Sequence, residues 1–307
     1  MKNILVLLAL HTAVSATVIW TENFELYDTT ILNLEDQALD GNGNPIWLTD
    51  PIATQSIAAI DSAPFALPSA FGDKVLAIGG LAPQGALFIP REVSVFSPAA
   101  LNYTPAFGSE ETELVLSMDM FFSAVDLNGL SPEITDSFRF SFFDKSDAAL
   151  GSLLFTQGTN GFNVSVLRDN LVSTFDTQFT LGSNTAVTLD LVMNLEFGKW
   201  SGSITPVGTL ASVPLFADVD MTDPSFNPQP ARELGSFQVA WIGLDKPVLE
   251  QADPANPLDS GNYNWGSNTL VLDNISLTSQ VPIPEPSSAL LLGGFSVLAL
   301  FRRSRRA

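Results

Sequence analysis

The 307-residue sequence has no cysteine, one histidine and few cations. The absence of cysteine excludes disulfides, thiolate nucleophiles, thiolate zinc sites and cysteine-held iron–sulfur clusters. The one histidine, His11, lies in a segment that we expect to be removed. Without it the chain has neither a Ser-His-Asp triad nor an imidazole metal ligand. Lys and Arg number 13 against 33 Asp and Glu, a net charge of −20. We therefore expect no nucleic-acid partner, because phosphate contacts need cations.

The N-terminus has the pattern of a secretory leader. Lys2 precedes a seven-residue apolar run, residues 4–10, and Val14-Ser15-Ala16 fits a signal peptidase site. We predict a signal peptide over residues 1–16, so that the exported chain begins at Thr17. The alternative interpretation is a buried first strand or helix.

The C-terminal segment, residues 281–307, has three parts. Three prolines within 282–286 argue against helix or central strand, because proline removes a donor and restricts φ. A 13-residue apolar run follows over 289–301, shorter than the roughly 20 residues of a relaxed spanning helix. The chain then ends in an arginine cluster: Arg302, Arg303, Arg305 and Arg306. These arginines predict a cytoplasmic end, with the body left outside. A plain tail anchor or a membrane-surface helix is the alternative.

This order of parts resembles a known sorting signal. Pro284-Glu285-Pro286, an apolar helix and a terminal arginine cluster are similar to the PEP-CTERM sorting domain of Gram-negative bacteria. The resemblance implies transient anchoring in the inner membrane and recognition by an exosortase, a membrane protease-transpeptidase that removes the tail near the motif. It also implies a cell-surface or extracellular-matrix protein, usually in bacteria that make exopolysaccharide.

The body, residues 17–280, is more acidic than the whole chain. Without Lys2 and the four tail arginines eight cations remain, and without Glu285 32 acids remain, which gives −24. Its 264 residues suit one large β-sandwich, which can bury a core without disulfides.

Apolar residues alternate with polar ones along most of the body, which predicts antiparallel strands with one buried face. The clearest alternating sets are Leu114, Leu116, Met118, Met120 and Phe122; Phe138, Phe140 and Phe142; Phe162, Val164 and Val166; and Val187, Leu189, Leu191, Met193 and Leu195. The alternating polar residues of the second set, Ser137, Arg139 and Ser141, are expected on a wet face. Further strands are predicted over 18–24, 75–78, 86–89, 150–156, 199–205, 237–243 and 270–278.

Turns and loops separate these runs. We predict a hairpin link over 196–199 and an Asn-Gly turn at 159–161. Two longer stretches, 217–234 and 245–268, are rich in Pro, Asp and Asn and are predicted to be irregular.

The opening residues Glu22-Asn23-Phe24-Glu25, the central hairpin with Trp200, and the closing run 270–277 resemble the strands of concanavalin A-like, laminin-G-like and carbohydrate-binding jelly rolls. The resemblance implies an all-β, antiparallel jelly-roll sandwich. It also implies a structural Ca²⁺ between the first and last strands, held by Glu22 or Glu25 with Asp273. Trp200 and Trp241 lie within predicted strands and are interpreted as core.

A second calcium candidate comes from spacing alone. Asp40, Asn42 and Asn44 place three oxygen side chains at alternate positions, as calcium loops do. Pro45 and Pro51 replace the Gly and Glu of an EF-hand, so the segment is not one. For both candidates a simple turn cluster or surface acid is the alternative.

Exposed aromatic rings beside amides are typical of sugar sites, because rings stack on sugar faces and amides bond hydroxyls. Such candidates are Asn262, Tyr263, Asn264 and Trp265, with Trp47 next. The alternative is a loop whose rings cover the core. The hydrolytic pattern Glu-x-Asp-x-x-Glu is absent. We therefore expect a non-enzymatic surface or matrix protein that binds polysaccharide. A carbohydrate-active hydrolase or lyase is the second hypothesis, and a purely structural surface protein is the third.

Overall fold

The computed structural model describes a set of segments within the 307 residues. They are residues 16–29, 34, 37, 43, 45–49, 57–79, 92–96, 113–123, 137–168, 173–221, 233–242, 244–245, 263–264 and 268–280. The predicted signal peptide up to residue 15, the predicted strand 86–89 and the whole segment 281–307 lie outside them.

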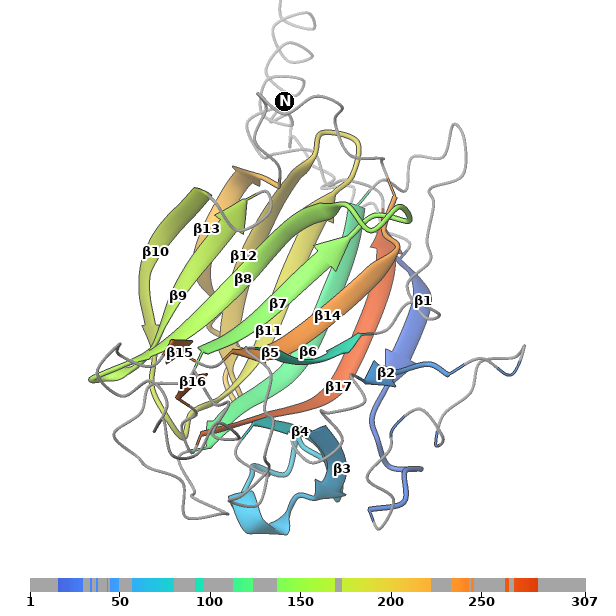
Figure 1. Cartoon of the computed structure of the whole chain (residues 1–307), viewed down its shortest axis with the longest axis vertical. Helices are drawn as coiled ribbons and strands as arrows, with labels where there is room; N and C mark the ends of the chain where they lie inside the picture. Colours follow the sequence, from blue (N-terminus) through green and yellow to red (C-terminus); the bar gives the residue numbers. More distant parts are fainter. Residues whose placement is uncertain are drawn as a thin grey trace, which may run out of the picture.

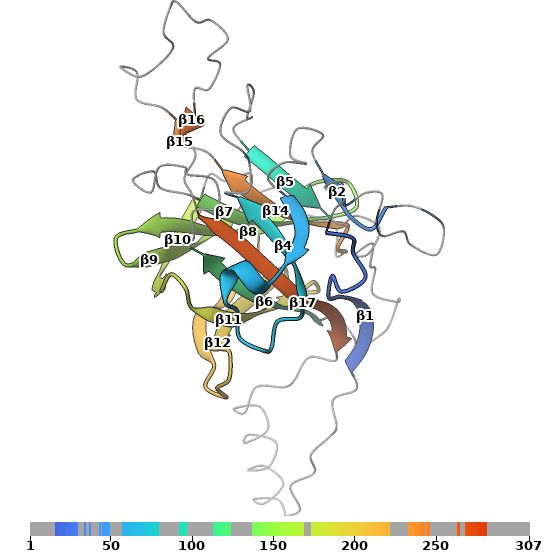
Figure 2. The same ribbon diagram turned by 90° about the horizontal axis from the view of Figure 1, so that it is seen from below.

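Two antiparallel sheets form the described part of the fold (Figures 1 and 2). The eight-stranded sheet runs in the order β13 (Val213–Asp220), β12 (Lys199–Pro206), β11 (Ala186–Asn194), β6 (Glu113–Ser123), β17 (Thr269–Gln280), β4 (Lys74–Gly79) and β3 (Ile57–Asp61), and β1 (Ala16–Glu22) also pairs with β17. The seven-stranded sheet runs in the order β10 (Ser173–Leu181), β9 (Gly161–Arg168), β8 (Ala149–Gly158), β7 (Ser137–Phe143), β14 (Ser236–Ile242), β5 (Glu92–Phe96) and β2 (Leu48–Thr49). A two-stranded ribbon joins β15 (Leu244–Asp245) to β16 (Tyr263–Asn264). A short 3-10 helix, η3 (Ala63–Phe65), lies between β3 and β4.

The core lies between the two sheets, and it is built from the alternating residues that the sequence predicts. Every second residue of β6 and β11 is buried, as the period of a strand requires. Phe122 of one sheet stacks on Phe162 of the other, with ring centroids 4.1 Å apart. Trp200 and Trp241, interpreted as core from the sequence, are both buried. The predicted antiparallel β-sandwich is therefore confirmed.

Two turns follow their local sequence. Thr159 and Asn160 form the turn between β8 and β9, and Gly161, the first residue of β9, has φ +130°, where a Cβ would collide with the carbonyl of Leu181. The link over 195–198 joins β11 to β12, with Gly198 at φ +63°. Both hairpin predictions are confirmed.

Two loop predictions need correction. The stretch 217–234 was expected to be irregular, but β13 continues to Asp220 as an edge strand paired with β12. The stretch 245–268 contains β16, whose backbone pairs with β15. Both strands were missed because their pairing partners, and not a long alternating run of their own, keep them extended.

A smaller apolar cluster covers part of the outer face of the eight-stranded sheet. Phe65 and Phe71 lie over Ala77, Phe121 and Val271. This segment, between β3 and β4, brings the backbone of Gly72 next to the middle of β17, where it takes part in an acidic site described below.

Candidate functional site

The outer face of the seven-stranded sheet carries a line of polar side chains across four adjacent strands. The register pairs Ser137 of β7 with Thr156 of β8, Thr156 with Asn163 of β9, and Asn163 with Thr180 of β10. We call these four residues the polar row. Three strand spacings of about 4.8 Å give it a length of about 14 Å. Ser137 is buried, whereas Asn163 and Thr180 are exposed, so the row opens toward the β10 edge.

Hydrogen bonds fix the polar row and the residues beside it. Thr180 Oγ1 donates to Asn163 Oδ1 at 2.9 Å, and Ser137 Oγ lies 3.5 Å from Thr156 Oγ1. The side chain pairs therefore present hydroxyl and amide groups in a defined geometry.

Arg139 lies one step along β7 from this row, and its side chain is only 9% exposed. Its Nε donates to Ser141 Oγ at 3.1 Å, and Ser152 Oγ donates to the same oxygen at 2.9 Å. The expectation that Ser137, Arg139 and Ser141 face water is therefore wrong for this strand. β7 is central in its sheet and is buried on both faces, so its polar side chains bond to one another.

The central strands that carry this face have no carboxylate. β7, β8, β9 and β14 contain neither Asp nor Glu. Glycoside hydrolysis needs two carboxyl groups on either side of the scissile bond. These four strands offer hydrogen-bond donors and acceptors without a carboxylate. The edge strand β10 carries a single one, the exposed Asp176, whose backbone pairs with Ser165 of β9.

The two-stranded ribbon places part of the predicted sugar-binding loop at the same end of the sheet. The backbone of Tyr263 pairs with Asp245, and that of Asn264 pairs with Leu244, two residues after β14 ends at Ile242. Ile242 is paired with Ser137, the first residue of the polar row. Asn268, further along the chain, donates from Nδ2 to Gln157 Oε1 of β8 at 2.9 Å. Asn262 and Trp265 lie outside the described residues, so their part of the prediction remains untested.

The structure places Trp47 in the core. Its ring is 0% exposed and packs edge-on against Trp20, with centroids 5.7 Å apart, and against Phe24 at 5.9 Å. A ring in that position cannot stack on a ligand at the surface. The proline and amides before it in the sequence suggested a loop, but the strand β2 that follows it pairs with β5 and draws it inward.

Of the calcium candidates, Glu25 and Asp273 come together. Asp273 Oδ2 accepts from the backbone N–H of Gly72 at 2.8 Å, and Glu25 Oε1 accepts from that of Lys74 at 3.3 Å. A Cβ on Gly72 would collide with Glu25 Oε1 and lie 3.6 Å from Asp273 Oδ2, so both carboxylates converge on this glycine. Glu22 is used elsewhere: its carboxylate accepts from the N–H of Phe24 and from the hydroxyl of Tyr27.

A bulge in β17 aims Asp273 at this place. The register shifts between Asp273 and Ser276, and Asn274 has φ 48°. Asn274 Nδ2 donates to Asp119 Oδ2 at 2.9 Å and to the carbonyl of Ala70 at 2.8 Å. Burial raises the pKa of Asp273 to about 6, and the charges of Glu25 and Asp119 add to the rise, against the two backbone N–H bonds. Ionisation of Asp273 therefore destabilises the folded state unless a cation lies beside the carboxylate.

Two carboxylates supply only part of the six to eight oxygens that calcium takes. Among the residues that the structure describes, no three acidic side chains are grouped closely enough to hold a metal ion. Asp40, Asn42 and Asn44 lie outside that part of the chain. Calcium at either place stays a prediction.

The residues of the sorting signal also lie outside the described part: Pro284, Glu285, Pro286, Arg302, Arg303, Arg305 and Arg306. Within the segments that are described, no helix is long and apolar enough to cross a membrane.

Comparison with known proteins finds one family model, the PEP-CTERM protein-sorting motif, which matches residues 282–306. The chain therefore carries the signal of an exported protein that an exosortase processes. No curated protein matches the sequence.

Solved structures share a similar arrangement at low identity. The catalytic domain of a glycoside hydrolase family 131 protein from Coprinopsis cinerea is 11% identical, with a TM-score of 0.47 over 88% of this chain and 98% of that one. The CBM2 module of the evolved Dit of Lactobacillus casei BL23 phage J-1 is 7% identical, with a TM-score of 0.46 over 88% and 99%. Peanut lectin is 10% identical, with a TM-score of 0.45 over 89% and 100%. At these identities the similarities assign no activity to this chain.

The polar row is the part of the site that sequence reasoning missed. Its residues appear in the sequence as ordinary wet-face positions on four separate strands. The signal that could have found them is the lack of any acidic residue in 137–168, in a body with 32 acids, apart from Asp144 and Asp147 in the turn between β7 and β8.

Proposed function

We propose that this protein is an exported cell-surface or matrix component of a Gram-negative bacterium that binds extracellular polysaccharide along the polar row, without cleaving it. The observation that carries the proposal is the polar row itself: four hydroxyl and amide side chains in register across four strands, in two hydrogen-bonded pairs. Sugar hydroxyls need such paired donors and acceptors in fixed positions.

Two features support binding without catalysis. Of the four strands that carry the row, β7, β8 and β9 have no carboxylate, and β10 has a single one, Asp176. The backbone of the ribbon that contains Tyr263 begins beside the row, and aromatic residues are of the type that stacks on sugars. The body has a net charge of −24 over residues 17–280 and would repel an acidic polysaccharide. The expected ligand is therefore a neutral or amino-bearing polysaccharide.

Affinity gel electrophoresis tests the proposal, with neutral, amino-bearing and acidic polysaccharides cast into separate gels. The variant Asn163→Ala/Thr180→Ala removes the exposed half of the row, and Thr205→Ala on the outer face of the other sheet is the matched control. We expect the double variant to lose retention in the gel and the control to keep it. The free energy of unfolding of both variants should lie within about 0.5 kcal/mol of the wild-type value.

Retention that does not depend on the row would refute the proposed surface. Release of reducing ends by the wild type would instead select the hydrolase hypothesis. The variant Tyr263→Ala/Trp265→Ala separates the two interpretations of the loop. A stability loss within about 0.5 kcal/mol with weaker retention marks a ligand platform, whereas a loss of about 3–5 kcal/mol marks core cover.

A further inference from the structure

The described part of the chain begins and ends at neighbouring positions of one sheet, next to the predicted signal peptide and the sorting motif. Ala16, the first residue of β1, is paired with Gln280, the last residue of β17. The sorting motif matches from residue 282, so it begins two positions after this strand ends. Since the last strand lies between β6 and β1, the tail departs from a fixed point in the middle of a sheet and not from a loose end.

The same row of the sheet leads from this point to the β11–β12 turn. Gln280 is paired with Glu113, Glu113 with Asn194, and Asn194 with Lys199. Two strand spacings, about 10 Å, separate the tail from the turn. Figure 1 shows this turn at the upper end of the molecule, opposite β15 and β16. The β15–β16 ribbon beside the polar row therefore lies at the other end of the sandwich from Gln280.

Side-chain hydrogen bonds brace this end from the tail to the turn. Glu113 accepts from Gln280 Nε2 at 3.4 Å and from Asn194 Nδ2 at 3.5 Å. Asn194 Oδ1 in turn accepts from the backbone N–H of Phe197 at 3.2 Å. The turn is thereby tied to the strand from which the tail departs.

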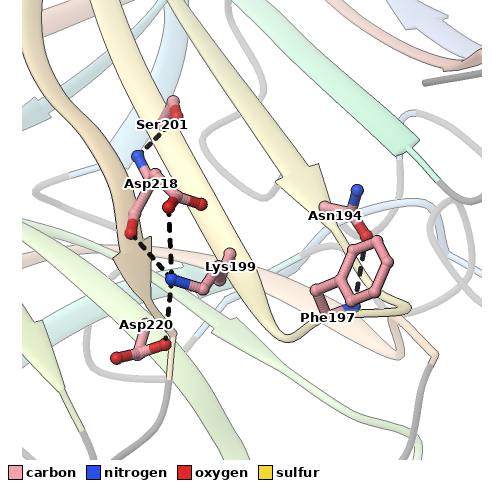
Figure 3. A network of polar contacts seen from close by, with 6 residues as sticks. All are labelled: Asn194, Phe197, Lys199, Ser201, Asp218 and Asp220. Carbon is pink, nitrogen blue, oxygen red and sulfur yellow. Dashed lines mark hydrogen bonds and ion pairs between the residues drawn. The ribbon is translucent and has the colours of Figure 1, made fainter. Parts of the chain in front are cut away.

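Ion pairs hold the other side of the same turn (Figure 3). Lys199 Nζ lies 3.3 Å from Asp218 Oδ2 and 3.5 Å from Asp220 Oδ1, and the N–H of Asp218 donates to Ser201 Oγ at 2.9 Å. The hydrogen bond to Asp218 is the main cause that raises the pKa of Lys199.

On this braced turn Phe197 presents an aromatic ring that is 68% exposed. The next row of the outer face adds aliphatic side chains, because Val18, 63% exposed, shares a register line with Val115 and Val192 through Thr278. We call Phe197 and these three valines the exit surface. The exposed ring and the valines lie close to the residue after which the tail begins. A protein that binds the tail would therefore come near them.

Chain length decides how near that partner must come. Pro284 is four residues beyond Gln280, and a fully extended chain covers about 3.3–3.6 Å per residue, so the motif stays within about 14 Å of the sheet. An enzyme that holds Pro284-Glu285-Pro286 in its active site therefore lies against this end of the folded body.

Charge favours a protein partner over the lipid surface. Around the β11–β12 turn the described residues include the carboxylates of Glu113, Glu196, Asp218 and Asp220 against the ammonium of Lys199. Anionic lipid attracts basic segments and repels an acidic surface such as this one.

We propose that the exit surface docks the membrane-embedded sorting protease, with Phe197 as its principal apolar contact. This inference rests on the proposed function, because it requires that the tail be processed. It adds a recognition element in the folded body to the linear motif. The partner surface has an apolar recess for one aromatic ring, bordered by positive charge that meets the carboxylates.

Pulse–chase labelling of the full chain in the native host tests this proposal, with tail removal followed by mass. The variant Phe197→Ser removes the ring, and Leu210→Ser is the matched control, since Leu210 is fully exposed in the turn at the other end of β12. We expect processing of Phe197→Ser to slow roughly tenfold, as for loss of one aromatic anchor. Leu210→Ser should be processed at the wild-type rate, and both mature proteins should melt with the wild type.

A Gly/Ser linker inserted after Gln280 is the second arm. With the linker, the enzyme can reach the motif without contacting the folded body. The wild type and Phe197→Ser should then be processed at the same rate when both carry the linker. Equal slowing by Phe197→Ser with and without the linker would overturn the docking surface, as would a wild-type rate for Phe197→Ser in the natural chain. Co-sedimentation of mature protein with phosphatidylglycerol vesicles, lost in Phe197→Ser, would assign the surface to lipid and also overturn it. A wild-type chain that still ends in Ala307 would refute sorting itself, which is the failure of the proposed function and not of the surface alone.

Discussion

Asp273 and Glu25 make the stability of this protein depend on pH in a defined direction. Burial and the neighbouring charges raise the pKa of Asp273 from 3.8 to about 6. The substitution Glu25→Gln removes one of those charges and keeps an oxygen that can accept from the N–H of Lys74. It therefore perturbs the electrostatics of the pair more than its packing.

The sign follows from the two protonation equilibria. The folded state holds the proton of Asp273 more tightly than the unfolded state, so this residue's contribution to stability is fully present below pH 3.8 and is lost as pH rises through about 6. At about 1.4 kcal/mol for each pH unit between the two pKa values, the loss is at most about 3 kcal/mol. Without the charge of Glu25 the pKa of Asp273 should fall by less than one unit, so Glu25→Gln should gain up to about 1 kcal/mol at pH 7.5.

The free energy of unfolding is measured by urea denaturation in the presence of a chelator, at steps between pH 4 and pH 8. Tryptophan fluorescence follows the unfolding. The control is Glu196→Gln, which removes an exposed carboxylate on the β11–β12 turn. Other carboxylates titrate in the same range, so the quantity to compare is the difference between each variant and the wild type at each pH. If Glu25→Gln follows Glu196→Gln at every pH, the inferred coupling between Glu25 and Asp273 is refuted.

Three further outcomes are expected. Millimolar calcium should raise the melting temperature relative to chelator, more than magnesium does, and Glu25→Gln should remove most of that gain; an unchanged melting temperature would end the calcium prediction. Phe122→Ala should cost about 3–5 kcal/mol in urea unfolding, because its ring is buried and stacks on Phe162 across the core, and a loss under about 1 kcal/mol would contradict that packing. Glu285→Ala should leave precursor in the membrane fraction of the native host, and normal release of a shortened chain would show that this glutamate is not required.

Local pattern predicts much of the sandwich but, apart from the β8–β9 and β11–β12 hairpins, not the order in which its strands pair. Alternation identifies the buried side of β6 and β11, because a strand turns successive side chains to opposite faces whatever its neighbours are. Alternation does not predict the burial of Arg139, because β7 is buried on both faces and a residue pattern cannot show that. Local pattern also does not predict the burial of Trp47, which directly precedes the two-residue strand β2 and packs in the core.

The sequence by itself determined that the chain is exported and sorted, since the sorting signal at 282–306 is a linear motif that needs no fold to be recognised. It also determined the class of fold, through the period of its apolar residues. Only the tertiary structure decided that Ala16 meets Gln280, that Glu25 and not Glu22 lies with Asp273 beside Gly72, and that four separate strands line up the polar row. Those contacts join residues far apart in the chain, and their register is set by backbone hydrogen bonds between strands, which leave no trace in the spacing of residues along any one strand.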